Sequence, residues 1–196
     1  DLHSVTHSFP TRRSSDLYLW FTLSDGRFDG LYAGKRSVVV MKIYHSSDVV
    51  VCRPDTIHSR EYLDFGKGFY LTTLYEQAER YAQRFLRRKK TAWINVYELD
   101  ENWENWKVLR FDSYNKDWLE FVSKCRMGKT VDDYDIVIGG IANDRVIVTL
   151  DRYFAGELSQ EETLGLLRFE KPNIQYCIRS ERMIKECLTY IESEKI

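Results

Sequence analysis

The amino-acid sequence predicts an α+β protein. Segments typical of strands and segments typical of helices both occur, but they do not alternate regularly, as they would in a doubly wound parallel sheet. The chain has 196 residues, of which 43% are hydrophobic and 14% aromatic. This length suits a single domain, and this composition is sufficient for a sizeable hydrophobic core.

The elements follow from hydrophobic periodicity and turn signals. Short apolar and aromatic runs predict strands at residues 41–45, 69–71, 93–97, 107–111, 136–138 and 174–178. Apolar residues at helical spacing predict helices at residues 74–85, 118–125, 144–154 and 160–168, and a last helix after Ser180 that carries Ile184, Cys187, Leu188 and Ile191. Thr73 and Glu76 match the capping-box pattern, so we expect them to cap the helix at residues 74–85.

The first forty residues are expected to lie outside the domain. Residues 7–17 read HSFPTRRSSDL, which resembles the translation of a sequencing-library adapter, so residues 1–17 are excluded from the fold as an adapter-derived artefact. A natural polar tail is the alternative. Residues 18–40 are either upstream sequence read through before a natural start at Met41 or a genuine strand or hairpin. We therefore predict one domain at residues 41–196.

Charge and cysteine usage exclude several classes of protein. The formal net charge of −1 argues against a chain that binds nucleic acid through its overall charge, although a local basic patch remains open. The four cysteines have no CxxC spacing, which indicates neither a zinc site nor a disulfide framework and favours a reducing cytoplasm. Because no apolar run approaches the roughly 20 residues that span a bilayer, we expect no membrane partner.

Three separated segments predict one site. Residues 63–72 read LDFGKGFYLT, in which two glycines frame a tight turn before an aromatic strand. Residues 44–47 read YHSS on an earlier predicted strand, and residues 174–178 read IQYCI on a late one. Taken singly, a histidine on a strand, a glycine turn and a strand tyrosine are most often structural. Their order along one chain is the informative observation.

This ordered set resembles the poly(ADP-ribose) polymerase-like ADP-ribosyltransferases. The sequence FGKGFY at residues 65–70, followed by a helix, resembles the second motif of that family. His45 matches the histidine of the first motif, with Ser46 in place of the usual glycine, and Gln175 takes the place of the usual glutamate of the third. The resemblance extends over most of residues 41–192 to bacterial stand-alone domains with a His–Tyr–Gln pattern. It implies a split, mixed and antiparallel β-sheet core with flanking helices.

The resemblance also implies an activity. Such an enzyme takes NAD as its substrate, needs no metal, transfers ADP-ribose to a protein or nucleic-acid acceptor and releases nicotinamide. The bond between ribose and nicotinamide breaks through an oxocarbenium-like transition state, as in glycoside cleavage. Nicotinamide is already a cationic leaving group, so the protein must mainly hold the dinucleotide, exclude water and position the acceptor. Small stand-alone members suggest a toxin-like role with a cognate antitoxin as partner.

The three motif residues have expected roles as the catalytic group. His45 would bind a ribose hydroxyl of the adenosine half, Tyr70 would line the nicotinamide pocket, and Gln175 would hold the nicotinamide-ribose hydroxyl. The Ser46 main chain would face the nicotinamide amide, which requires a negative φ and a side chain that points away.

The remaining expected NAD-binding residues surround this group. Gly68 belongs to the floor of the nicotinamide pocket, Thr72 adds a hydroxyl, and Tyr81 stacks on the pyridinium ring. Arg60 or His58, just before the glycine turn, would reach the NAD phosphates, although a plain loop is equally compatible with these residues.

Gln175 is where the chain departs from the family pattern. An amide does not ionise near neutral pH, so Gln175 cannot act as a general base. This departure keeps alternatives open: an NAD glycohydrolase, an RNA 2′-phosphotransferase on the same fold, or a catalytically inactive module that binds ADP-ribose or a partner.

Overall fold

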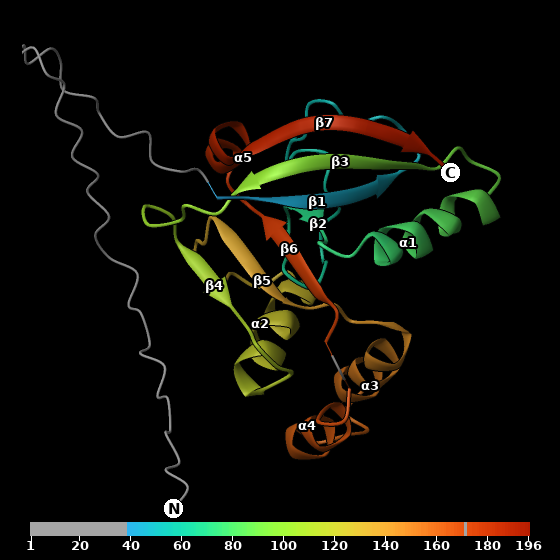
Figure 1. Ribbon diagram of the computed structural model, residues 1–196. Coiled ribbons are helices and arrows are strands. Elements are labelled where there is room, and N and C mark those ends of the chain that lie inside the picture. The colour runs from blue at the N-terminus through green and yellow to red at the C-terminus, as the bar shows by residue number, and fades with distance from the viewer. Residues whose placement is uncertain (1–38, 171) are drawn as a thin grey trace, which may run out of the picture. The chain divides into compact units, whose positions relative to one another are not determined.

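The protein was analysed in a computed structural model that describes residues 39–170 and 172–196 (Figure 1). The adapter-like residues 1–17 and nearly all of residues 18–40 lie outside the described residues. The described part of the chain is α+β, as predicted. Its strands are β1 (Val40–Ser47), β2 (Phe69–Leu71), β3 (Trp93–Asp100), β4 (Val108–Arg110), β5 (Ile136–Gly140), β6 (Ile174–Ile178) and β7 (Leu188–Lys195). Its helices are α1 (Tyr75–Arg87), α2 (Lys116–Arg126), α3 (Asp144–Phe154), α4 (Gln160–Leu167) and α5 (Glu181–Cys187).

The strands form two sheets, which Figure 1 shows one above the other. The first sheet has the order β1-β3-β7 and is antiparallel. The second has the order β2-β6-β5-β4, in which β4 and β5 are parallel and the other pairs antiparallel. An isolated bridge between Tyr44 and Thr72 joins the sheets, with N–H···O distances of 2.8 and 3.0 Å. The end of β2 therefore reaches β1 of the other sheet.

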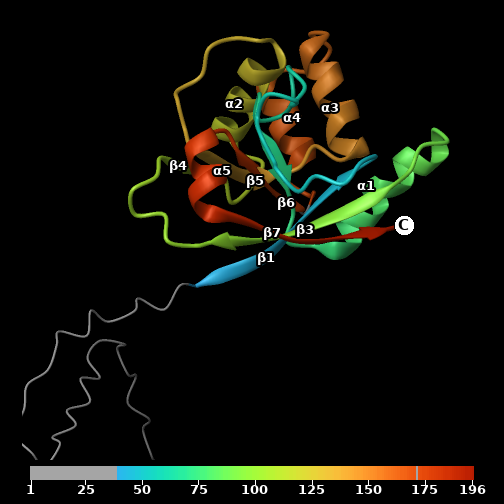
Figure 2. The same ribbon diagram turned by 90° about the horizontal axis from the view of Figure 1, so that it is seen from above.

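The core lies on both faces of the second sheet. Alternation of side chains sends Ile136 and Ile138 of β5 to one face and Val137 to the other. The first face packs against the first sheet and α5, and the opposite face is covered by α2, α3 and α4 (Figure 2). Each large apolar side chain buried there contributes about 1.5–3 kcal/mol. α1 covers the remaining face of the first sheet with Ala78 and Ala82.

The predicted capping box of α1 is wrong. The N-cap of this helix is Leu74, whose carbonyl accepts the Gln77 N–H at 3.1 Å, and no side chain caps it. Thr73 therefore lies one residue before the cap, and Glu76 lies one residue too early to close the box. The Thr72 hydroxyl instead accepts the Leu74 N–H at 3.2 Å, so the turn into the helix uses the preceding threonine.

The end of the chain also differs from the prediction. Ser180 caps α5 as expected, because its hydroxyl accepts the Met183 N–H at 3.3 Å. The helix then stops at Cys187, and Leu188 begins a strand that pairs with β3. The helical spacing of Leu188 and Ile191 was misleading, because the edge of β3 offers unpaired backbone groups and this pairing outweighs local propensity.

Gly68 lies where β2 passes close to β6. A Cβ at this position would lie 2.5 Å from the Cys177 Sγ and 2.8 Å from the main-chain oxygen of Ile178. A glycine is therefore required for the approach of the two strands. Gly66, two residues earlier, has φ +74°, a left-handed conformation that glycine adopts at no steric cost.

We expect Gly68→Ala to destabilise the domain by about 2 kcal/mol, because the oxygen of Ile178 belongs to the main chain and cannot turn aside. Gly165→Ala is the matched control, since a Cβ there meets no atom within 4 Å. This helix substitution should be neutral or stabilise the protein by roughly 0.5–1 kcal/mol. Chemical denaturation measures both variants, and equal stabilities would contradict the close approach.

Candidate functional site

The hydroxyl of Tyr70 closes the glycine turn that precedes its own strand. It donates to the carbonyl of Gly66 at 2.5 Å and accepts the N–H of Phe65 at 3.1 Å. The turn is also closed by the Gly66 N–H, which donates to the Leu63 carbonyl at 3.0 Å. Burial raises the pKa of Tyr70 well above its usual range, so the phenol stays protonated. What Tyr70 can offer a ligand is therefore its ring rather than its hydroxyl.

His45 on β1 is held by the main chain of β2. Its Nδ1 lies 2.8 Å from the Tyr70 carbonyl oxygen, and its ring centroid lies 4.4 Å from that of Phe69. A carbonyl can only accept, so Nδ1 carries the proton and Nε2 is an acceptor in the neutral ring. Loss of hydration on burial lowers the pKa of His45, and the bond to Tyr70 only partly opposes this. No residue in the described part of the chain bonds Nε2.

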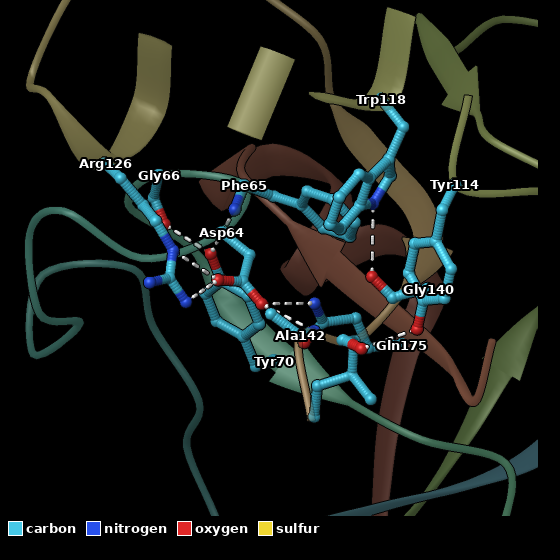
Figure 3. Close-up of polar contacts among 11 residues, drawn as sticks. Asp64, Phe65, Gly66, Tyr70, Tyr114, Trp118, Arg126, Gly140, Ala142 and Gln175 are labelled. Carbon is cyan, nitrogen blue, oxygen red and sulfur yellow. Dashed lines mark hydrogen bonds and ion pairs between the residues drawn. The ribbon is translucent and has the colours of Figure 1, made fainter. Parts of the chain in front are cut away.

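Asp64 forms a polar centre that the sequence analysis did not single out (Figure 3). Its Oδ1 accepts from Arg126 Nε at 2.9 Å and from Arg126 Nη2 at 2.6 Å. Its Oδ2 accepts the Ala142 N–H at 3.1 Å and the Gln175 Nε2 at 3.4 Å. The side chain of Asp64 is 11% exposed and that of Arg126 22%. The residues that donate to Asp64 lie 62 to 111 positions away along the chain. A local sequence pattern therefore could not indicate that Asp64 joins separate elements.

The three motif residues lie on neighbouring strands, but their side chains do not all point the same way. Tyr70 pairs with Cys177, so Tyr70 and Gln175 share one face of the second sheet. His45 instead packs on Phe69, whose side chain points to the opposite face of β2. The main chain of Tyr70 thus lies between the imidazole on one side and the Tyr70 ring and Gln175 amide on the other.

Two of the predicted NAD-binding residues are buried and hold the fold together. The Ser46 hydroxyl donates to the Ala78 carbonyl at 2.6 Å, and the φ of Ser46 is not positive, so its side chain points towards α1. Thr72 accepts from the Leu74 N–H, and its hydroxyl lies 3.4 Å from the carbonyl oxygen of Ile174 on β6. The Ser46 main chain rather than its hydroxyl is left to face a ligand, whereas the main-chain N–H and C=O of Thr72 are both bonded to Tyr44.

The other predicted NAD-binding residues lie further out. Gly68 is buried against β6, and its N–H donates to the Ser59 hydroxyl at 3.1 Å. Tyr81 is 40% exposed on α1, with the Arg84 guanidinium 5.2 Å from its ring centroid. Arg60 is exposed in the loop before the glycine turn. No described contact ties Tyr81 or Arg60 to His45 or Gln175.

Three further observations concern metal ligands, cysteines and membrane-spanning helices. Among the described residues, no group of three or more His, Cys, Asp or Glu is arranged to hold a metal ion. The cysteines are free thiols, with Cys125, Cys177 and Cys187 buried and Cys52 exposed. None of the helices in the described ranges has both the length and the apolar character needed to cross a bilayer.

A hollow of about 490 Å³ lies near the ends of α2 and α3. It is bordered by apolar side chains such as Met127, Tyr153 and Phe154 together with Lys124 and Lys129. None of the predicted site residues borders it, so this hollow and the motif strands are separate features.

Comparison with known proteins places the chain in a family. Residues 41–190 match the family described as "Protein of unknown function (DUF3990)". This match covers well over half of the 196 residues, so the chain belongs to that family. Neither a curated protein nor a solved structure shows a significant match. The α+β domain described above is therefore a representative of this family's fold.

We expect Asp64→Ala to destabilise the domain by about 2–3 kcal/mol, because Arg126 and the Ala142 N–H would lose their acceptor. Asp48→Ala is the matched control: its ion pair with Lys90 joins side chains that are 35% and 56% exposed. That change should cost less than about 1 kcal/mol. Urea denaturation measures both, and a similar small loss in each would show that Asp64 is not a structural centre.

We expect the folded protein to lose stability in acid through His45. Its folded pKa is lowered below the value of about 6.5 for an unfolded histidine, so the stabilisation is complete above that pH. It is lost as the pH falls through the unfolded pKa towards the folded one. His45→Gln keeps a donor for Tyr70 and should flatten this slope. Denaturation midpoints between about pH 5 and pH 8 test this, and equal slopes in the parent protein and the variant would contradict it.

Proposed function

We propose that this protein is an ADP-ribosyltransferase that uses NAD as its donor substrate, on an ADP-ribosyltransferase-like split-sheet fold. The observation that carries the proposal is that the three motifs lie on laterally neighbouring strands: β1 bridges the end of β2, and β2 pairs with β6. Residues that are 25 and 105 positions apart in sequence thus share one region, where the two sheets meet, with the His45 side chain on one side of the β2 main chain and the Tyr70 and Gln175 side chains on the other. The resemblance in sequence and this adjacency support the same function.

The groups near the motif strands suit a hydroxyl-rich dinucleotide. His45 offers Nε2 as an acceptor for a ribose hydroxyl, and the Ser46 main chain is available for the nicotinamide amide because its side chain is bonded to α1. The Tyr70 ring offers an aromatic surface, since its hydroxyl is already used. Thr72, Gly68, Tyr81 and Arg60 stay proposed secondary contacts.

In the proposed reaction the bond between the ribose C1′ and the nicotinamide nitrogen breaks, and nicotinamide leaves with the electron pair. An acceptor atom of a protein or nucleic acid forms the new bond to C1′ and gives up its proton to solvent or to a base. Gln175 cannot be this base. The chain's own contribution is therefore binding and orientation, which suit a cationic leaving group that needs little acid assistance.

The hydrogen bond between Gln175 and Asp64 favours a second candidate function. An amide that is buried and bonded to Asp64 is compatible with a module that binds ADP-ribose without turning NAD over. If transfer does occur, the setting we propose is the bacterial cytoplasm, with a toxin-like effect and a cognate antitoxin as the binding partner.

We expect the purified protein to transfer label from NAD carrying a radioactive ADP-ribose group to macromolecules in a bacterial lysate. His45→Ala and Tyr70→Ala should each lower the transfer rate at least roughly tenfold, the equivalent of one lost hydrogen bond or stacking contact. Tyr114→Phe is the control, because it removes a hydroxyl bonded to the Ile141 carbonyl at 2.8 Å outside the motif strands.

The other outcomes separate the alternatives. Nicotinamide release without labelled macromolecules would favour an NAD glycohydrolase, and transfer only with 2′-phosphorylated RNA would favour the phosphotransferase. Binding of ADP-ribose without any turnover would favour the inactive module. Unchanged transfer by His45→Ala would contradict the proposed site.

A further inference from the structure

The Gln175 amide is oriented by Asp64. Its Nε2 lies 3.4 Å from the Asp64 Oδ2. An ionised carboxylate only accepts hydrogen bonds, so the half of the amide that faces Asp64 is its NH₂ group. The amide oxygen Oε1 therefore points away from Asp64, and no residue at positions 39–170 or 172–196 donates a hydrogen bond to it.

Asp64 has little freedom to turn away from Gln175. The permanently charged guanidinium of Arg126 binds Oδ1 through two nitrogens, and the Ala142 N–H binds Oδ2 (Figure 3). Both carboxylate oxygens are thus fixed by groups from α2 and from the connection between β5 and α3. The carboxylate is thus a fixed acceptor, and the Gln175 amide takes the orientation that this acceptor imposes.

This arrangement accounts for the amide at position 175. A glutamate there would bring a second carboxylate to the place where Nε2 now lies, about a hydrogen-bond length from Asp64. Two carboxylates at that distance cannot both be ionised without a large penalty. Glutamine fills the position without that repulsion and still presents an oxygen acceptor on its far side.

We propose that Asp64 is a positioning residue that fixes the polarity of the Gln175 amide, so that Oε1 is presented as the acceptor for a hydroxyl of the ligand. The ligand part of this inference rests on the proposed function and names the nicotinamide-ribose hydroxyl of NAD. Asp64 itself is bonded on both oxygens and takes no part as a base.

Substitutions that exchange hydrogen-bond donor and acceptor at residues 64 and 175 test the inference. In Asp64→Asn the oxygen of Asn stays on Arg126 and its NH₂ replaces Oδ2. The Ala142 N–H then loses its acceptor, which lowers stability, and Gln175 must turn its oxygen inward to accept from the NH₂. The group offered to NAD is then a donor, and the dissociation constant for NAD should rise about tenfold. In the double variant Asp64→Asn/Gln175→Glu the new carboxylate accepts from Asn and again offers an oxygen outward. Affinity should return to within about threefold of the original, with the net charge unchanged.

Calorimetric titration with NAD measures these affinities. Asp112→Asn, at an exposed residue, is the matched control and should bind as the parent protein does. The inference is overturned if Asp64→Asn binds NAD as tightly as the parent, or if the double variant binds no better than Asp64→Asn. Absence of NAD binding by the parent protein would instead overturn the proposed function.

A second measurement tests the Asp64–Gln175 contact without any ligand. In Gln175→Glu alone, Asp64 should raise the folded pKa of the new carboxyl above its unfolded value of about 4.3. The melting temperature relative to the parent should then be highest at low pH and fall as the pH rises through the folded pKa. The double variant, which lacks the Asp64 charge, should show a smaller fall, because only burial of the new carboxyl then raises its pKa. Identical pH profiles for the single and double variants would show that Asp64 does not orient residue 175.

Discussion

The structure depends on the carboxylate of Asp64. One side chain joins the glycine turn to the end of α2, to the connection between β5 and α3, and to β6. A buried charge is costly unless it is paired and fully hydrogen-bonded, and here Arg126 supplies the charge while two N–H groups complete the coordination. Because these partners lie on separate elements, the turn, the helix and the strand can take their positions only together.

The polar groups of the candidate site are also hydrogen-bonded within the fold. Three of them are bonded to main-chain atoms: the Tyr70 hydroxyl, the Ser46 hydroxyl and the Nδ1 of His45. These groups therefore fix the geometry of β1 and β2 and are not available to a ligand. What remains is a set of acceptors and an aromatic ring. Acceptors and an aromatic ring can bind and orient a hydroxyl-rich molecule.

The periodic elements of the fold could be predicted from the sequence because their signals are local. The helix at residues 144–154 and the buried strands β5 and β6 were recognised from spacing alone. Two predictions failed. Leu188 and Ile191 fit a helix by spacing, yet both lie on β7, where Leu188 pairs with Leu99 of β3 and Ile191 lies at a register shift. The capping-box residues Thr73 and Glu76 lost to a local turn, in which the Thr72 hydroxyl accepts the Leu74 N–H. In each case a hydrogen bond outweighed a difference in propensity of less than about 1 kcal/mol.

The sequence by itself determined that this is an α+β domain with a glycine-framed turn before a tyrosine strand, and that His45, Tyr70 and Gln175 lie on three separate strands. Only the tertiary structure decided that these strands are neighbours, that the Tyr70 hydroxyl is used within its own turn, and that Asp64 faces Gln175. The physical reason is the distance along the chain over which each interaction acts. Periodicity and turn preferences act over a few residues, whereas a buried carboxylate accepts from whichever donors the packed fold brings to it, here from up to 111 residues away.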